Sequence, residues 1–233
     1  MSHAEIRSTF DAWAASGRAE SMEQGHGDVV RQVLAKLAVR PGDRILDLGC
    51  GNGWATRLLA KAGPGVSAVG VDVAPAMVAR AEERTSLTIR ARYEVAAFEA
   101  LPFADGSFQR IFSMEAIYYA VDLDGALAEC ARVLAPGGTL DLVLDCFAES
   151  PTTRGWSVLV GLPMHCLPEA EWRARLERAG FTAIELARVI DSRGPGDRAR
   201  KSIGRGVIAR PSDEVGFSAT GRRRQGTGRY QRG

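Results

Sequence analysis

Residues 45–59 read ILDLGCGNGWATRLL, and this stretch decides the fold. A short apolar run ends at three alternating glycines, Gly49, Gly51 and Gly53, and a helix-forming segment follows at once. An apolar run halted by glycine is typical of a strand buried in a parallel sheet. Glycine also lets a backbone turn tightly and approach a ligand closely. The stretch therefore predicts a strand, a ligand-binding loop and a helix in succession.

Strands and helices alternate on both sides of this stretch. Strands are expected at 66–73, 91–96, 107–114, 139–147, 181–190 and 206–209, and helices at 5–16, 29–39, 54–62, 75–85, 122–134 and 168–180. Such alternation indicates βαβ units. The predicted fold is α/β: a doubly wound, Rossmann-like, mostly parallel seven-stranded sheet with N-terminal helices and a small lid. Its binding crevice should lie at the carboxyl ends of the strands.

Two acidic residues accompany the glycines. Asp47 stands just before the loop, and Asp72 ends the second predicted strand, 19 residues after Gly53. The spacing is G-x-G-x-G rather than the G-x-G-x-x-G of a pyrophosphate binder, and a carboxylate at Asp47 suits an ammonium group. An acid at Asp72 can accept hydrogen bonds from both ribose hydroxyls. Taken singly, Asp47 could equally be a turn acid and Asp72 a strand-end cap.

In combination these motifs resemble the class I S-adenosylmethionine-dependent methyltransferases, especially the small-molecule branch called type 11. DLGCGNG (47–53) is similar to the first family motif, VGVDVAPAMV (69–78) to the second, and the stretch from EALPF (99–103) to LAPGG (134–138) to the later ones. The resemblance implies S-adenosylmethionine as cofactor, with S-adenosylhomocysteine as its product. It places cofactor contacts at Asp47, Gly49, Cys50, Gly51, Gly53, Asp72, Val73, Met77, Ala97, Phe98 and Met114.

One position departs from the family pattern. The family often has Asp-Ala before the Glu-x-Leu-Pro-Phe segment, with the acid bonding the adenine amine, whereas this chain has Ala97-Phe98. The adenine would then have one fewer side-chain hydrogen bond, and a backbone contact from Phe98 would remain.

The acceptor pocket should come from parts outside the core motifs. The expected substrate contacts are Trp13, His26, Tyr118, Tyr119 and Trp156, and the expected catalytic groups are His165, Tyr119 and Glu115. Core packing explains Trp13 equally well, and one of the two tyrosines should belong to the core. Methyl transfer mainly requires alignment of the reacting groups. A base is needed only for a protonated acceptor.

The chain is expected to form one methyltransferase domain over residues 1–211, with an N-terminal cap helix in 1–27 and a lid at 148–167. Residues 193–233 hold eleven Arg or Lys against three Asp or Glu. The last part, 212–233, has too little apolar content to fold and is expected to be a disordered basic tail. That tail leaves open an RNA (tRNA) methyltransferase anchored by it. A separate alternative is a catalytically inactive S-adenosylmethionine-binding protein.

Composition sets further limits. Hydrophobic residues make up 45% and charged residues 25% of the chain, and no apolar run approaches the ~20 residues of a membrane span. Charged residues interrupt the first 30 positions, so a cytoplasmic protein is expected, a monomer or homodimer acting on a small molecule. The three histidines are scattered and the four cysteines stand singly, which predicts no metal site. Cys50, Cys130 and Cys146 are expected to be reduced, buried thiols.

Overall fold

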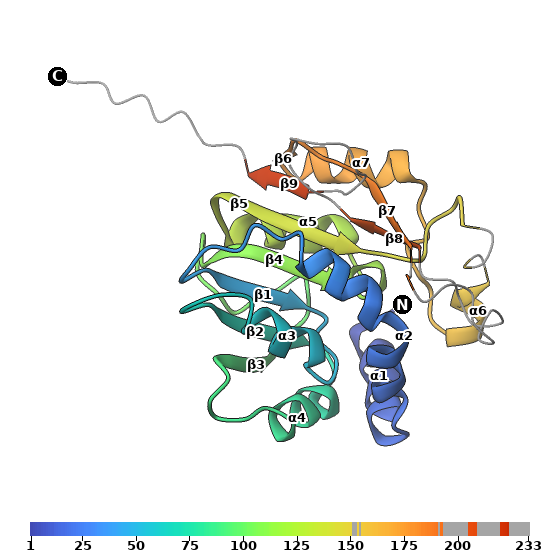
Figure 1. Cartoon of the computed structure of the whole chain (residues 1–233). Helices are drawn as coiled ribbons and strands as arrows, with labels where there is room; N and C mark the ends of the chain where they lie inside the picture. The colour runs from blue at the N-terminus through green and yellow to red at the C-terminus, as the bar shows by residue number, and fades with distance from the viewer. Residues whose placement is uncertain (151–152, 154, 191, 193–204, 209–219, 224–233) are drawn as a thin grey trace.

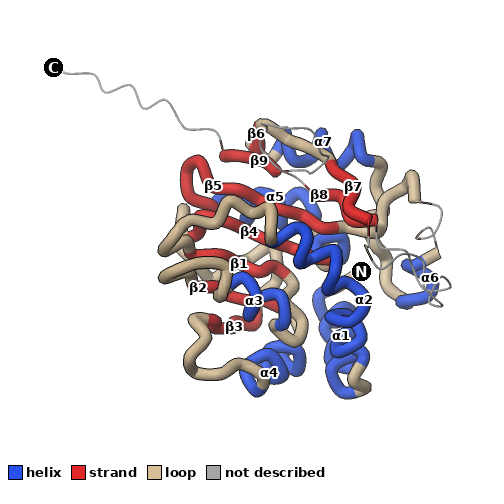
Figure 2. Tube along the Cα trace, viewed as in Figure 1, coloured by secondary structure: helices blue, strands red, loops and turns tan. Residues whose placement is uncertain are grey.

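The computed structural model describes residues 1–150, 153, 155–190, 192, 205–208 and 220–223. A central sheet runs through the molecule with helices on both of its faces (Figures 1 and 2). The helices are α1 (His3–Ala15), α2 (Arg18–Leu34), α3 (Trp54–Leu59), α4 (Pro75–Glu83), α5 (Leu123–Val133), α6 (Trp156–Val160) and α7 (Glu169–Arg178), with a 3-10 turn, η1 (Ile117–Tyr119). None of the described helices combines the length and hydropathy needed to cross a bilayer.

The central sheet has the strand order β3-β2-β1-β4-β5-β9-β6. Its first five strands are mutually parallel: β3 (Ala91–Val95), β2 (Ser67–Asp72), β1 (Arg44–Leu48), β4 (Phe108–Met114) and β5 (Leu134–Val143). The chain builds outward from β1 in one direction and then returns to the other side of it with β4. Ligands of such sheets bind where the strand order reverses, outside the carboxyl ends of the strands. The predicted Rossmann-like parallel core is therefore confirmed.

Successive residues of β1 serve the two faces of the sheet, as the two-residue period of a strand requires. Leu46 and Leu48 join a buried cluster that includes residues of α5 and α7. Ile45 joins a second cluster with residues of α2 and α3. Every residue from Ile45 to Leu48 is buried, which is typical of a parallel strand covered on both sides.

The N-terminal helices differ from the expectation in their bounds. Ser2 and Glu5 form a reciprocal capping box at the start of α1. Helix α2 begins at Arg18, eleven residues before the predicted start at 29, and ends at Leu34 rather than at 39. The glycines in this helix obscure its start in the sequence. The apolar residues Val29, Val30 and Val33 bury one face of α2, and such packing outweighs weak helix propensity.

The strand predicted at 181–190 is broken in two. Ala183 has a positive φ of 53°, which ends β6 (Phe181–Thr182) before β7 (Ala187–Ile190) begins. β7 pairs with β8 (Arg205–Ile208) in a separate two-stranded sheet, so the strand expected at 206–209 lies outside the central sheet. β5 also differs from expectation, since it begins at Leu134, five residues before the predicted start at 139, and ends at Val143.

Strand β9 (Thr220–Arg223) lies between β5 and β6 and runs antiparallel to both. For these four residues the prediction of a disordered tail is wrong. The rest of 212–233 lies outside the described residues. The open edge of β5 offers unpaired backbone groups, which can pair with a strand whatever its side chains are. Composition alone could not reveal this pairing.

Candidate functional site

The glycine loop after β1 is fastened to the end of β2 by backbone hydrogen bonds. The N–H groups of Gly49 and Cys50 both donate to the carbonyl oxygen of Val71, each over 2.9 Å. The N–H of Gly51 donates to Oδ2 of Asp72, also over 2.9 Å. The loop therefore has a defined position at the carboxyl ends of β1 and β2, where the crevice was expected.

Each of the three positions is suited to glycine for a different structural reason. A Cβ on Gly49 would clash with Ala116 at the turn after β4, and a Cβ on Gly53 would lie 2.6 Å from the hydroxyl oxygen of Tyr93. A Cβ on Gly51 would meet nothing within 4 Å. All three have positive φ, where non-glycine residues are strained. Gly49 and Gly53 thus allow close packing, while Gly51 borders open space with room for a ligand.

The two carboxyl groups of the site are both buried. Asp47, at 1% exposure, accepts a 2.5 Å hydrogen bond from the Thr56 hydroxyl at Oδ2. Asp72 accepts from the Gly51 and Ala74 N–H groups, each at 2.9 Å. Desolvation raises the pKa of Asp47 to about 7 and that of Asp72 to about 6, against the lowering effect of these hydrogen bonds. Buried carboxyls with raised pKa values at a crevice are typical of ligand sites.

Several predicted cofactor contacts surround this loop. The ring of Phe98 approaches Gly49, since a Cβ there would lie 3.2 Å from Cζ of Phe98. The carbonyl oxygen of Val73 accepts a 3.2 Å hydrogen bond from Nε of Arg7 on α1. Val73, Ala97, Phe98 and Met114 keep partial exposure. These residues therefore retain surface that a ligand could contact.

Two other predicted cofactor residues point into the protein. The Cys50 side chain packs with Val78, Ala81 and Tyr93, and burial raises the pKa of its thiol well above the usual range. Only the backbone of Cys50 remains to meet a ligand. Met77 is 3% exposed and packs against residues of α1 and α2.

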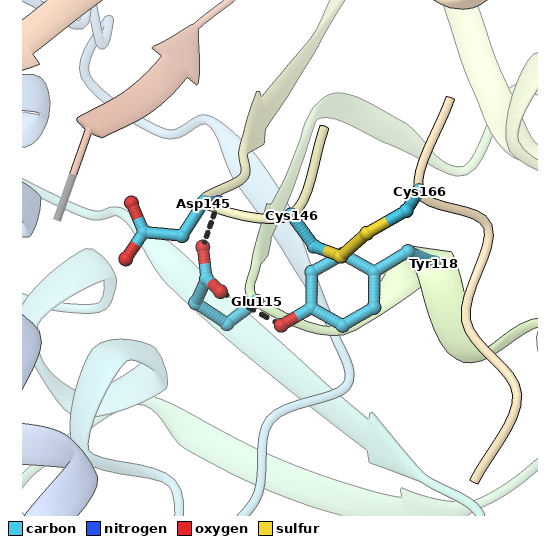
Figure 3. Close-up of a disulfide and its surroundings, with 5 residues drawn as sticks. All are labelled: Glu115, Tyr118, Asp145, Cys146 and Cys166. Atoms are coloured by element: carbon cyan, nitrogen blue, oxygen red, sulfur yellow. Dashed lines mark hydrogen bonds between the residues drawn. A yellow bond between two sulfur atoms is a disulfide. The ribbon is translucent and has the colours of Figure 1, made fainter. Parts of the chain in front are cut away.

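On the other side of the loop, Glu115 follows β4 with a positive φ of 52°. Its Oε2 accepts a 2.7 Å hydrogen bond from the Tyr118 hydroxyl, and its Oε1 accepts a 2.6 Å bond from the Asp145 N–H (Figure 3). Burial, and next the Asp145 charge, raise the pKa of Glu115 well above its usual range. A non-glycine residue in this backbone region is often found at functional sites.

A disulfide lies beside this carboxyl group. Cys146, which follows Asp145, is bonded to Cys166, with their Cα atoms 5.2 Å apart (Figure 3). The expectation of a reduced Cys146 is therefore wrong. The two cysteines are 20 residues apart in sequence, and fold geometry rather than spacing brings them together. Cys50 and Cys130 are free and buried, as expected.

Tyr118, Tyr119 and His165 meet at η1. Both tyrosines are buried, and burial raises the pKa of each. The backbone N–H of His165 donates to the carbonyl of Tyr118, and its Nε2 lies 2.9 Å from the carbonyl oxygen of Ala120. A carbonyl can only accept, so Nε2 carries the proton and Nδ1 alone could accept one.

The remaining predicted acceptor residues are dispersed. Trp13 packs with Phe10 and lies under the guanidinium of Arg18, 3.8 Å from it, on the side of α4. His26 is a half-buried residue of α2. Trp156 begins α6 and packs against the buried cluster that includes residues of β4 and β5. Phe10 makes the aromatic contact to Tyr119, with ring centroids 5.1 Å apart. The structure thus brings Tyr118, Tyr119 and His165 together beside Glu115, and Phe10 links Trp13 to Tyr119.

Sequence reasoning missed two residues of this region. Asp145 was hidden inside the predicted strand 139–147, although β5 ends at Val143. Asn52 lies within the glycine motif, where attention falls on the glycines. The observed strand order, with the glycine loop at the carboxyl end of β1, defines a Rossmann-like protein.

Comparisons with known proteins agree with that class. The family model of a methyltransferase domain matches residues 45–138. An O-methyltransferase, resE, of Aspergillus sclerotiorum is 30% identical over 78% of this chain and 71% of its own length. The malonyl-acyl-carrier-protein O-methyltransferase of Halorhodospira halophila is 38% identical over 58% of this chain and 46% of its own length.

A solved structure covers more of the fold. A complex of a Haloferax volcanii methyltransferase with the Trm112 methyltransferase activator matches with a TM-score of 0.79 and 31% identity, over 91% of this chain and 96% of the matched chain. The chain therefore belongs to the class I S-adenosylmethionine-dependent methyltransferases.

Proposed function

We propose that the chain transfers the methyl group of S-adenosylmethionine to an oxygen atom of a small-molecule acceptor. The observation that carries the proposal is the pair of buried carboxyls, Asp47 and Asp72, beside a glycine loop that borders open space at Gly51. When bound, the cofactor supplies a methyl group already activated on a sulfonium. The choice of oxygen rests on the names of the two O-methyltransferase relatives.

In this proposal Asp72 accepts the ribose hydroxyls and Asp47 faces the ammonium group. Gly49, Gly51 and the Cys50 backbone border the methionine portion, with Gly53 shaping the loop. Val73, Met77, Ala97 and Phe98 surround the adenine, and Met114 lines the floor. The raised pKa of each acid favours this role, because a ligand that stabilises the ionised form relieves the cost of burying it.

We propose that the methyl acceptor binds at the turn after β4, against which Gly49 packs. An oxygen acceptor must lose a proton, and Glu115 is the group we assign to accept it, with Tyr118 and Tyr119 positioning the substrate. Only Nδ1 of His165 could accept a proton, so we assign His165 to supporting η1.

We propose that residues 148–167, with Trp156, form the lid of the site. The exposed Val158 and Leu159 of α6 give that lid an apolar surface. Trp13 and His26 border the N-terminal side of the site.

The two alternatives have less support. An RNA acceptor would rely on the basic residues 193–233, of which the structure describes only β8 and β9. An inactive binding protein does not require the strained Glu115 beside the site.

A titration and a labelling experiment test the proposal. Titration of S-adenosylhomocysteine into chelator-treated protein should show one site per chain, and no heat at millimolar ligand would refute it. With methyl-labelled S-adenosylmethionine, the label should then be recovered in small molecules extracted into organic solvent. Label recovered in acid-precipitated RNA would instead support the RNA alternative.

A further inference from the structure

A row of aromatic rings joins helix α1 to the proposed acceptor position. Phe10 packs edge-on against Trp13, with ring centroids 5.0 Å apart, and against Tyr119, with centroids 5.1 Å apart. The ring of Tyr119 lies 4.8 Å from that of Tyr118, whose hydroxyl donates to Glu115. Phe10 and Trp13 are only partly buried. The row therefore runs from the proposed base toward the surface and keeps apolar area that a flat ligand can cover.

Arg18, the first residue of α2, stands at the outer end of this row. Its guanidinium carbon lies 3.8 Å from the centroid of the Trp13 ring, which is a cation–π contact. Burial, and next the charge of Glu115, raise the pKa of Tyr119, and the charge of Arg18 opposes that rise. The guanidinium is therefore close enough to the Tyr119 hydroxyl for the two groups to interact electrostatically.

The charge of Arg18 is not neutralised by an acid. The side chain is exposed, and no ion pair joins it to an acidic residue in the described part of the chain. Two acids of α1 and α2 have other partners: Glu20 pairs with Arg84 at 2.6 Å, and Asp11 accepts a 2.9 Å hydrogen bond from the Ala76 N–H. A guanidinium held flat on an indole ring, with no acidic partner, can donate two parallel hydrogen bonds to a carboxylate.

We infer that the methyl acceptor is a planar aromatic hydroxy acid whose carboxylate is bound by Arg18 and whose hydroxyl lies at Glu115. Its rings pack along Phe10, Trp13 and Tyr119. The acceptor oxygen bonds to the methyl carbon, S-adenosylhomocysteine leaves with the electron pair of the broken carbon–sulfur bond, and the hydroxyl proton passes to Glu115. This inference rests on the proposed function, names its substrate class, and makes Arg18 a specificity-determining residue.

Two rigid probes that differ at one group test the inference. 6-Hydroxy-2-naphthoate carries a hydroxyl and a carboxylate at opposite ends of a flat ring system, and 6-hydroxy-2-naphthamide has a neutral amide in place of the carboxylate. Both are titrated by fluorescence into protein saturated with S-adenosylhomocysteine. We expect the wild-type chain to bind the naphthoate at least about tenfold more tightly than the naphthamide, the effect of one charge-assisted pair.

Three variants assign this preference to a residue. Arg18→Gln should lower the affinity for the naphthoate to that for the naphthamide, and should change naphthamide binding less than about threefold. Arg18→Lys keeps the charge but loses the planar fork, so it should retain part of the preference. Arg31→Gln removes a cation from the last turn of the same helix and should keep the whole preference. All three variants should bind S-adenosylhomocysteine as the wild-type chain does.

Several results would overturn the inference. They are equal wild-type affinities for the two probes, a preference that survives Arg18→Gln, and failure of both probes to bind at millimolar concentration. Methyl label recovered as the methyl ester of the naphthoate would also contradict it, because the carboxylate would then lie at Glu115 instead of Arg18. Any of these results with S-adenosylhomocysteine still bound leaves the proposed function standing. If the wild-type chain does not bind S-adenosylhomocysteine, the proposed function fails and this inference with it.

Discussion

Asp72 can be both a strand-end cap and a ribose-binding acid, the two roles that its position in the sequence allows. Its two oxygens accept hydrogen bonds from Gly51 and Ala74, so it is a structural acid for the loop and for the start of α4. Each carboxylate oxygen has a second lone pair, which remains for a ribose hydroxyl. The structural and functional roles are therefore compatible.

Cofactor affinity should depend on the charge of Asp72. With a pKa of about 6 in the ligand-free protein, most of the carboxyl is ionised at pH 7 and little of it at pH 5. If the ionised form binds ribose, the titration of Asp72 should by itself lower the affinity for S-adenosylhomocysteine about tenfold between these pH values, and the titration of Asp47 should add to this fall. Asp72→Asn should weaken binding at pH 7 by about 1.5–3 kcal/mol and flatten this part of the profile. Titration calorimetry measures both effects, with the exposed Asp105→Asn as control. An unchanged slope in Asp72→Asn would assign the titration to another group.

Asp47 should lower the stability of the ligand-free protein at neutral pH. Its folded pKa, about 7, lies above its ordinary value of 3.8, so the folded chain binds its proton more tightly than the unfolded chain. The free energy of unfolding should therefore fall as the pH rises from about 4 to 7. Asp47→Asn can still accept the Thr56 hydrogen bond without a buried charge. We expect it to stabilise the protein by about 1–3 kcal/mol at pH 8 and by less at pH 5.

Urea unfolding at the two pH values measures this difference. Glu94→Gln, at a partly exposed position of β3, should show no such pH-dependent gain. Equal effects of Asp47→Asn at pH 5 and pH 8 would contradict the assignment of the buried charge as the cause.

At the scale of elements, α1 contacts two segments that border the candidate site, the start of α4 and the segment at Glu99. Asp11 accepts a 2.9 Å hydrogen bond from the Ala76 N–H at the start of α4, whose own N-cap residue makes no side-chain bond. At the other end of the helix, Nε2 of His3 lies 2.9 Å from Oε2 of Glu99, next to Phe98. α1 therefore contacts segments on both sides of the predicted adenine position.

Removing the long-range cap should destabilise the fold. Asp11→Ala leaves the first turn of α4 without its side-chain acceptor and should cost about 1 kcal/mol, a usual value for a helix cap. Asp11→Asn retains an acceptor oxygen and is the matched control. Urea unfolding of both variants gives the comparison, and equal losses in the two would show that charge rather than capping matters.

The elements also show what a sequence can and cannot reveal. The run from Ile45 to Gly53 predicted β1 and its loop because period, composition and glycine spacing agree locally. The bounds of α2 and the break after Thr182 depended on tertiary packing and on one residue, Ala183, with positive φ. The Asp11 cap and the Cys146–Cys166 bond join positions far apart in sequence, so no local pattern could predict them.

At the scale of the whole molecule, the main difference from expectation is β9. A pair of strands, β9 and β6, completes the sheet beyond β5, and β9 comes from the segment expected to be a disordered tail. Pairing to an open sheet edge is decided by backbone groups from distant parts of the chain. The positions of Asp47, Asp72 and the three glycines at the ends of β1 and β2 were predictable because these residues share a family motif, whereas the burial of the Asn52 side chain could be seen only in the structure.

Strand β9 should contribute to stability. A chain ending at Pro211 lacks the strand between β5 and β6, so its melting temperature should fall by about 5 °C or more. A chain ending at Gln225 keeps β9 and should melt within about 1 °C of the full chain. Thermal unfolding followed by circular dichroism tests both. Equal melting temperatures for the full chain and the Pro211 chain would show that β9 adds no stability.

The bond between Cys146 and Cys166 acts on the unfolded chain as well as the folded one. It closes residues 146–166 into a covalent ring, which reduces the conformational entropy available after unfolding. For a ring of this size the chain-entropy argument gives about 3 kcal/mol, a stabilisation that no contact in the folded molecule supplies. Reduction of the bond would remove this stabilisation. The resistance of this enzyme to unfolding is therefore set partly by the redox state of its surroundings.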